Sequence, residues 1–164
     1  MKAALLIATV ALAAAGCASY SGRGLEPGKS TESDVTRVMG APTETLARAN
    51  GDKVLYYSRQ PEGRATYAAT VAPDGSLRSL QQVLQPENIH RIVAGIPESQ
   101  VRELLGPPAK TGRTPFKPFD IWEYRWQFGE DRRVLWVAFA NGVAQEVTEM
   151  HDFEWEPNTG PGKD

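Results

Sequence analysis

The sequence is poor in the residues that build metal and redox sites, with one cysteine, Cys17, and two histidines, His90 and His151, among 164 residues. A single thiol excludes an intramolecular disulfide and the multi-cysteine zinc sites. Basic residues show no excess either, because 18 Lys and Arg stand against 20 Asp and Glu. Nucleic acid is therefore not an expected partner. G-x-S-x-G turns and phosphate-cradling glycine loops are also missing, so neither catalysis nor a cofactor is predicted.

One long apolar run stands at the N-terminus, where Lys2 precedes the segment 3–15. A charged residue followed by a short apolar run is typical of a secretory signal, and these 13 residues fall short of the ~20 that a membrane-spanning helix needs. The small residues at 14–16 directly before Cys17 resemble a bacterial lipobox. We expect residues 1–16 to be removed and Cys17 to be lipidated. The alternative is a plain signal cleaved near Ala15, which leaves Cys17 as a free or intermolecularly paired thiol.

The lipobox resemblance also implies a location. In the lipoprotein family an aspartate directly after the cysteine retains the protein in the inner membrane, and Ala18 stands there instead. The implied site is the outer membrane, with the chain anchored through fatty acyl (palmitate-type) chains on Cys17 and facing the periplasm. Several acyl chains on one residue hold a protein permanently, whereas one chain binds only marginally.

Both ends of the mature chain are polar. Residues 17–27 form the lipidated N-terminus and contain Ser19, Ser21, Gly22 and Gly24, which favours a flexible spacer. Residues 155–164 are rich in Pro, Gly and charge, which favours a disordered tail.

An internal repeat organises the rest. The segment 32–42 aligns without gaps onto 98–108, an offset of 66, and Asp74-Gly75 falls on Asn141-Gly142 at an offset of 67. Apolar residues at i, i+3 and i+4 predict a short helix in each copy, and Gly40 and Gly106, each with a proline two residues later, predict matched helix ends.

Three strands are predicted after each of these helices. They cover residues 53–58, 65–71 and 77–84 in the first copy, and 121–128, 134–139 and 143–150 in the second. Asp74-Gly75 and Asn141-Gly142 are typical of two-residue type I′ hairpin turns, which makes the pairing antiparallel. A further short helix is expected over 88–93.

These elements predict the α+β class: two tandem helix-plus-three-strand units, 28–86 and 87–154, the second with an extra helix. Because each unit is too small for a large core, we expect them to share one antiparallel sheet, with the helices packed on it as a two-layer sandwich.

This arrangement, a short helix with a Gly-x-Pro stop followed by three strands with an aromatic-x-Tyr motif, resembles the SmpA/OmlA (BamE-like) family of small outer-membrane lipoproteins. The family-like arrangement occurs twice within residues 28–150. The resemblance implies a role in outer-membrane assembly or maintenance. In its tandem form it is similar to the β-lactamase inhibitor protein architecture, in which two such units present a concave sheet. A barrel-assembly subunit of the family normally has one copy of the unit, and its membrane- and partner-contacting loops have no counterpart here.

The strand over 121–128 is the most distinctive local feature, because Trp122, Tyr124, Trp126 and Phe128 alternate with polar residues and so share one face. The first interpretation is a structural core. The second is an aromatic surface for a protein partner. Tyr57 and Trp136 could extend either the core or this surface. A hard cation at His151 with Glu149, Asp152 and Glu154 has less support than a solvated acidic strand end.

The sequence therefore predicts a non-catalytic, lipid-anchored scaffold that binds a protein of the cell envelope. The alternative function is an inhibitor of a periplasmic or secreted enzyme, and a hydrolase built on His151 is the weakest candidate.

Overall fold

The computed structural model describes residues 19–115 and 117–152. The helices are α1 (Glu32–Met39), α2 (Pro86–Ile89) and α3 (Glu98–Leu105). The strands are β1 (Glu44–Ala47), β2 (Lys53–Ser58), β3 (Thr66–Val71), β4 (Leu77–Gln82), β5 (Lys110–Arg113), β6 (Asp120–Phe128), β7 (Asp131–Ala140) and β8 (Val143–His151). Within the described part of the chain, no helix has the length and apolar character needed to cross a membrane.

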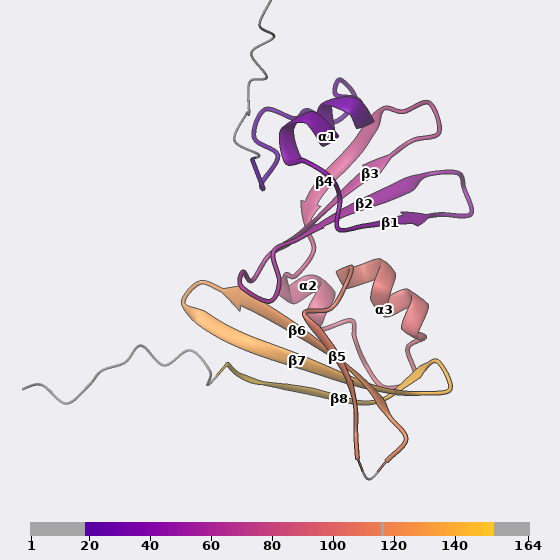
Figure 1. Cartoon of the computed structure of the whole chain (residues 1–164), viewed down its shortest axis with the longest axis vertical. Helices are drawn as coiled ribbons and strands as arrows, with labels where there is room; N and C mark the ends of the chain where they lie inside the picture. Colours follow the sequence, from indigo (N-terminus) through magenta and orange to yellow (C-terminus); the bar gives the residue numbers. More distant parts are fainter. Residues whose placement is uncertain (1–18, 116, 153–164) are drawn as a thin grey trace, which may run out of the picture.

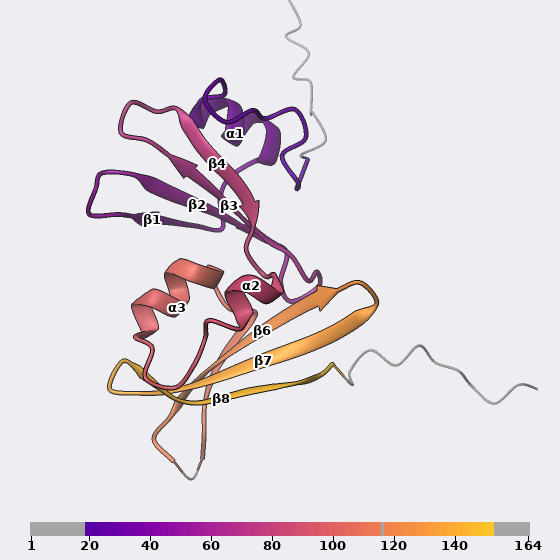
Figure 2. The ribbon, with the colours of Figure 1, turned by 180° about the vertical axis from the view of Figure 1, so that it is seen from behind.

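The elements stack in layers along the long axis of the molecule (Figures 1 and 2). Helix α1 covers one face of a sheet with the order β1-β2-β3-β4, called sheet 1. Helices α2 and α3 lie between sheet 1 and a second sheet with the order β5-β6-β7-β8, called sheet 2. All neighbouring strands are antiparallel. The layer order is therefore α1, sheet 1, α2 with α3, and sheet 2.

The predicted α+β class with two repeated units is confirmed, but the expectation of one shared sheet is wrong. Each unit has its own sheet of four strands, not three. The additional strands are β1 and β5, the edge strands that pair with β2 and β6. Their sequences, ETLA and KTGR, carry only two apolar residues, the adjacent Leu46 and Ala47, so they lack the alternation that signals a strand. Backbone pairing with the neighbouring strand holds them in place.

The two repeat helices have the same length and the same stop. Each has eight residues, from Glu32 in α1 and from Glu98 in α3. Thr31 caps α1 through a capping box with Asp34, whereas Pro97 occupies the N-cap of α3 without a side-chain cap. Both helices end at the predicted glycine, with φ of +85° at Gly40 and +74° at Gly106. Helix α2 begins at Pro86 and ends at Ile89, earlier than the predicted 88–93.

The two repeat hairpins differ in their turns. Asn141 and Gly142 both have positive φ, 52° and 75°, as the predicted type I′ turn requires. At Asp74-Gly75 only the glycine has positive φ, so the type I′ prediction is wrong there. The Asp74 carboxylate accepts hydrogen bonds from the backbone N–H and the hydroxyl of Ser76, at 2.9 and 2.7 Å. This local bonding favours a wider turn, which closes with a hydrogen bond from Ala72 N to Ser76 O.

Sheet 1 is apolar on both faces. One face packs Leu55, Tyr57 and Leu77 against Val35 and Met39 of α1. The opposite face carries a separate buried cluster that α1 does not reach, made of Val54, Tyr56, Ala68 and Val83. The end of α3 covers it: Tyr56 Oη donates a 2.7 Å hydrogen bond to the carbonyl of Glu103, and Gly106 lies against the Tyr56 ring. The second unit therefore completes the core of the first.

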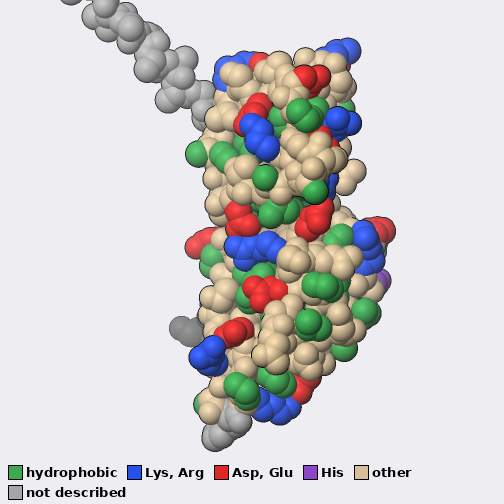
Figure 3. Space-filling model, turned by 90° about the vertical axis from the view of Figure 1, so that its right-hand side faces the viewer, with side chains coloured by type: hydrophobic (Ala, Val, Ile, Leu, Met, Phe, Trp, Pro, Cys, Tyr) green, Lys and Arg blue, Asp and Glu red, His purple; other side chains and the backbone are tan. Residues whose placement is uncertain are grey.

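Charged contacts join the units around this apolar junction. Arg102 of α3 binds the Glu44 carboxylate of β1 through two guanidinium nitrogens, Nε at 2.8 Å and Nη2 at 2.5 Å. Arg48 lies 2.8 Å from Glu103. Figure 3 shows acidic and basic side chains side by side in the middle of one side of the molecule. A bidentate carboxylate pair fixes orientation as well as contact.

The C-terminal end of β8 is tied to the first unit as well. Arg64, from the β2–β3 loop, pairs with Asp152, whose carboxylate side chain is 1% exposed. In the same loop, the Gln60 side chain accepts a 2.7 Å hydrogen bond from the backbone N–H of Arg125 and so caps an open position on β6. The junction thus combines apolar burial with polar contacts from several elements.

The described part of the predicted spacer is folded onto the first unit. Ser19 N donates to Val38 O at 2.8 Å, and Gly28 N donates to Leu77 O at 2.8 Å. Gly22 is buried, and a Cβ there would lie 2.3 Å from Leu80. The expectation of a flexible segment through residue 27 is therefore wrong from Ser19 onward. Cys17, the signal segment 1–16 and the tail 155–164 lie outside the described residues.

The two repeat glycines provide a matched test of the junction. Gly40→Ala introduces only backbone strain, of about 1–3 kcal/mol, because nothing lies within 4 Å of a Cβ at that position. Gly106→Ala adds a clash, since its Cβ would lie 2.7 Å from Tyr56. We expect the Gly106 variant to lose about 1–3 kcal/mol more free energy of unfolding than the Gly40 variant in urea titrations. Equal losses would contradict the close approach.

The capping box of α1 predicts acid sensitivity. Hydrogen bonds from the Thr31 backbone and from Arg37 and the Thr31 hydroxyl lower the pKa of Asp34 from 3.8 to about 2. The depressed pKa means that this carboxylate stabilises α1 above pH 3.8 and that the contribution disappears as the pH falls towards about 2. NMR titration of the Asp34 carboxyl carbon should give that midpoint. An unshifted midpoint would rule out the capping box in solution.

Candidate functional site

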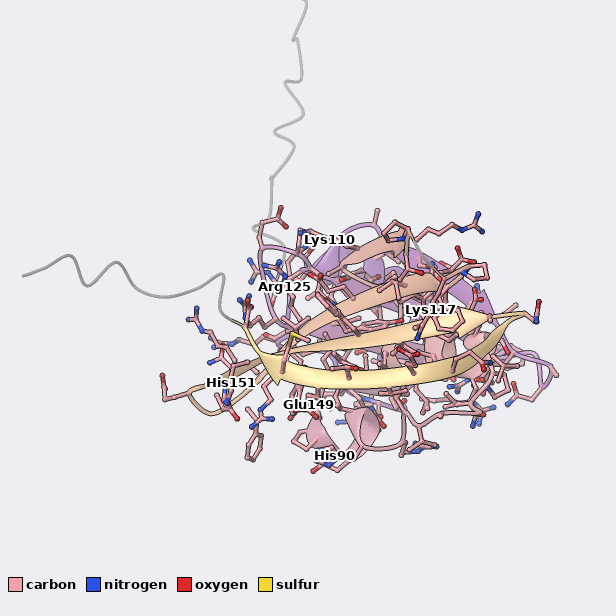
Figure 4. All side chains as sticks on the ribbon, turned by 90° about the horizontal axis from the view of Figure 1, so that it is seen from below. His90, Lys110, Lys117, Arg125, Glu149 and His151 are labelled. Atoms are coloured by element: carbon pink, nitrogen blue, oxygen red, sulfur yellow. The ribbon has the colours of Figure 1, made fainter. Side chains whose placement is uncertain are left out.

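The outer face of sheet 2, the face opposite α2 and α3, is the candidate functional site. Tyr124, Trp126, Leu135 and Val137 point towards these helices and form the core of the second unit. Strand geometry sends their neighbours Glu123, Arg125, Val134 and Trp136 to the opposite side. Figure 4 shows this side of the molecule, where strands lie in front of the helices. No described helix covers it.

The loop between β5 and β6 folds over this outer face. Lys117 in the loop lies 2.5 Å from Glu146 of β8, so the loop extends across β6 and β7. Thr114 and Phe119 close the loop with a 3.0 Å backbone hydrogen bond. The overhang creates an open groove of about 350 Å³, whose lining includes Gly112, Pro115, Ile121, Glu123 and Trp136.

Trp136 is held in the groove by its neighbours. The residue is 42% exposed, and its indole Nε1 donates a 3.1 Å hydrogen bond to Glu123, the residue opposite it on β6. The other carboxylate oxygen of Glu123 accepts a 2.9 Å hydrogen bond from Arg125. The side chains of Glu123 and Arg125 are 14% and 13% exposed. The Trp136 ring is therefore oriented by Glu123 and still accessible, which limits the entropy lost when a partner binds.

Three of the aromatic residues considered for partner binding lie in the core. Tyr57 is 2% exposed under α1, Tyr124 is 0% exposed and Trp126 is 3% exposed. Burial raises the pKa of the Tyr124 hydroxyl well above its usual range, and that hydroxyl donates a 3.1 Å hydrogen bond to Gly106 O. The interpretation of these three as an exposed aromatic surface is wrong. Small cores depend on large aromatic side chains, which is why the first interpretation holds for them.

Trp122 and Trp136 reach the surface on opposite faces of sheet 2. Trp122 is half-buried, packs on Phe139 and lies under the Arg102 guanidinium at 5.1 Å, at the unit junction. Trp136 lies on the outer face. Phe128 is 63% exposed near the β6–β7 turn, away from the groove lining. The aromatic alternation on β6 therefore identified the inner face, whereas the groove uses the alternate positions, 121 and 123.

Sequence patterns carried little signal for the rest of the groove. Pro115 and Lys117 belong to a loop for which the sequence predicts no structure. Glu123 was noted only as a polar residue between two aromatic ones. The loop contributes by folding back over strands that lie far from it in sequence order, which no local pattern encodes. Cross-strand pairing of Glu123 with Trp136 is likewise a product of register.

The histidines do not line the groove. His90 is exposed at the end of α2, and His151 Nδ1 lies 3.3 Å from Asp131 Oδ1 near the β6–β7 turn. Of the acidic residues expected around His151, Asp152 is buried and paired with Arg64, so it is not part of a solvated strand end, and Glu149 lies 2.9 Å from Arg133. Glu154 lies outside the described residues. In the described ranges, no group of three His, Cys, Asp or Glu side chains is placed to hold a metal.

Comparison with known proteins gives likeness at the level of solved structures only. No protein-family model and none of the curated proteins matches the chain, so the resemblance to the SmpA/OmlA family is not supported. The chain is similar to the crystal structure of YjgB, a DUF4309 family protein of Bacillus subtilis, with a TM-score of 0.32 and 19% identity over 79% of this chain and 82% of that chain. It is also similar to a "putative beta-lactamase inhibitor protein" of Streptococcus mutans, with a TM-score of 0.33 and 14% identity over 74% of this chain and 82% of that chain.

Two tryptophans on opposite faces of sheet 2 predict losses of stability of different size for the same substitution. Trp126→Ala removes a core ring and should lower the free energy of unfolding by about 3–5 kcal/mol. Trp136→Ala removes a ring that is 42% exposed and should cost about 1 kcal/mol or less. Urea unfolding followed by far-UV circular dichroism compares the two. A larger loss for Trp136 would place that residue in the core and remove the candidate site.

Proposed function

We propose that the chain is a non-catalytic, lipid-anchored protein of the bacterial envelope that binds a partner protein through the outer face of sheet 2. The observation that carries the proposal is Trp136, which is 42% exposed and oriented by Glu123 in a groove on a sheet face without a helix. Tryptophan is among the residues most enriched at the energetic centres of protein interfaces.

The polar groups of the groove favour a protein over a small ligand. Small-molecule sites combine apolar walls with a few polar groups that remain available to orient the ligand. Here both oxygens of the Glu123 carboxylate already accept hydrogen bonds, from Trp136 and from Arg125. Pro115 and Ile121 add apolar surface beside the ring. Lys110 and Arg113 add basic groups to the lining, and such a shallow, mixed surface suits the side chains of a protein partner.

The location follows from the sequence motif. Cys17 carries lipid, the residues before it are removed, and the anchor lies in the outer membrane with the folded part in the periplasm. Cys17→Ala should shift the protein from the membrane fraction to the soluble periplasmic fraction and abolish metabolic labelling with palmitate. Unchanged labelling in this variant would contradict the anchor.

In-cell photo-crosslinking tests the binding surface. A benzoylphenylalanine at position 136 should form one dominant adduct. Benzoylphenylalanine in place of Val93 provides a control outside the groove. Val93 is an apolar residue in the α2–α3 connection and is 57% exposed, which is similar to Trp136. Strong adducts at 136 and weak ones at 93 support the proposal. Equal adducts at both positions, or none at 136, contradict it.

The identity of the crosslinked partner distinguishes a scaffold from an inhibitor. If the captured partner is an enzyme, the purified protein should slow it at stoichiometric amounts, and Trp136→Ala should lose that effect while remaining folded. If the partner is an envelope protein without an activity to inhibit, loss of Trp136 should instead reduce the recovered complex. Either result supports binding through the groove, and an unchanged affinity for Trp136→Ala would contradict it.

A further inference from the structure

We propose that the molecule is a rigid column that holds the outer face of sheet 2 away from the membrane, so that this face binds a protein or domain in the aqueous periplasm. The proposal rests on the lipid anchor and the binding surface of the proposed function and adds their relative placement. Its basis is where the chain enters the fold, how the layers are stacked and how the two units are joined.

The chain enters the fold directly after the lipidation site. Ser19 N donates a 2.8 Å hydrogen bond to Val38 O near the end of α1. Tyr20 Oη donates a 3.2 Å hydrogen bond to Ser58 O at the end of β2, and the Arg59 guanidinium lies 4.4 Å from the centre of the Tyr20 ring. Only Ala18 separates these contacts from Cys17. Two residues of chain reach about 7 Å at most, so the lipidation site stays close to Ser19.

The attachment point lies beside the first two layers of the stack, α1 and sheet 1, and the groove lies on the last layer. The N-terminal segment packs beside α1, whereas the outer face of sheet 2 is the last surface of the stack (Figures 1 and 2). Three layer spacings of about 10 Å separate α1 from sheet 2, a rise of about 30 Å. That rise is comparable with the thickness of a bilayer core.

The junction makes the stack act as one body. The apolar cluster around Tyr56 is completed by the end of α3, and Glu44 with Arg102 and Arg64 with Asp152 bind across two different parts of the junction. The connection from β4 to α2 has three residues, and two of them, Val83 and Leu84, are buried. A short buried linker and contacts on several sides oppose hinge motion between the units.

This geometry selects the kind of partner. A surface that starts about 30 Å above the anchored end cannot rest on the bilayer that holds the lipid. Trp136 therefore meets proteins, or extramembrane domains, that extend into the periplasm. Membrane-embedded segments beside the anchor would instead meet α1 and the N-terminal segment.

Energy transfer from the protein to headgroup-labelled lipids tests the orientation without needing the partner. The lipidated protein in vesicles carries one donor dye, at Ser33→Cys on α1 or at Thr148→Cys on β8. Both positions are exposed, and Thr148 lies opposite Trp136 on the outer face. Because the lipid occupies Cys17, the new thiol is the only one free. With about 30 Å between the ends of the stack, transfer from position 148 should be lower than from position 33 by about two-fold or more.

A linker variant supplies the control. A flexible Gly-Ser insertion of about 20 residues between Ala18 and Ser19 spans about 25 Å on average and should remove most of the difference between the two positions. Equal transfer at both positions without the insertion, or greater transfer at 148, would overturn the orientation. Failure of the protein to bind vesicles would instead contradict the anchor, and absence of an adduct at position 136 would contradict the binding surface. The adduct should also map to a partner segment outside the bilayer, and a membrane-embedded segment would overturn the proposal.

Discussion

Sheet 1 has two apolar faces, and its own unit covers only one of them. Alternate residues of β2 make both faces apolar, with Leu55 and Tyr57 towards α1 and Val54 and Tyr56 on the other side. Leaving a large apolar side chain in water instead of burying it costs about 1.5–3 kcal/mol. The first unit therefore needs a second layer against it, and the end of α3 supplies that layer with Gly106 lying against the Tyr56 ring.

The need to cover the second face of sheet 1 determines where the helices of the second unit lie. Helix α3 buries Val101 and Leu105 against sheet 2, while Arg102 and Glu103 on the same helix contact the first unit. Because α2 and α3 are confined between the two sheets, no described helix remains for the far side of sheet 2. The β5–β6 loop covers part of that side and leaves Trp136 accessible. The uncovered face is thus a consequence of the stacking, and its orientation away from α1 follows from the same layer order.

Local patterns predicted the repeat and the matched helices, including both stop glycines, because helix periodicity and left-handed glycine positions are encoded over a few residues. All six predicted strands were found as well, as β2, β3, β4, β6, β7 and β8, because strand composition and hairpin turn residues are also local signals. Strands β1 and β5 were missed because edge strands with exposed side chains have no apolar pattern to find. The shared sheet was a wrong expectation, because whether two units pair edge to edge or stack face to face depends on Tyr56 and its neighbours meeting α3.

The candidate site was less predictable than the fold. Trp136 was named from sequence, but as an extension of aromatic positions that fill the core, among them Tyr124 and Trp126. The aromatic alternation on β6 marks the buried face, but the groove lies on the other face and depends on a loop that folds across two strands. That folding is not a local property. Asp152 shows the same limit, since a terminal acidic residue is expected in solvent and is instead paired with Arg64 from the other unit.

The two units form one cooperative body through the Tyr56 junction. Urea unfolding followed by NMR resonances of Val54 in sheet 1 and Leu135 in sheet 2 measures each unit separately in the intact chain. Both resonances should share one urea midpoint, and in a Tyr56→Ala variant both midpoints should fall by the same amount. Two separate transitions, with a Tyr56→Ala effect confined to sheet 1, would contradict it.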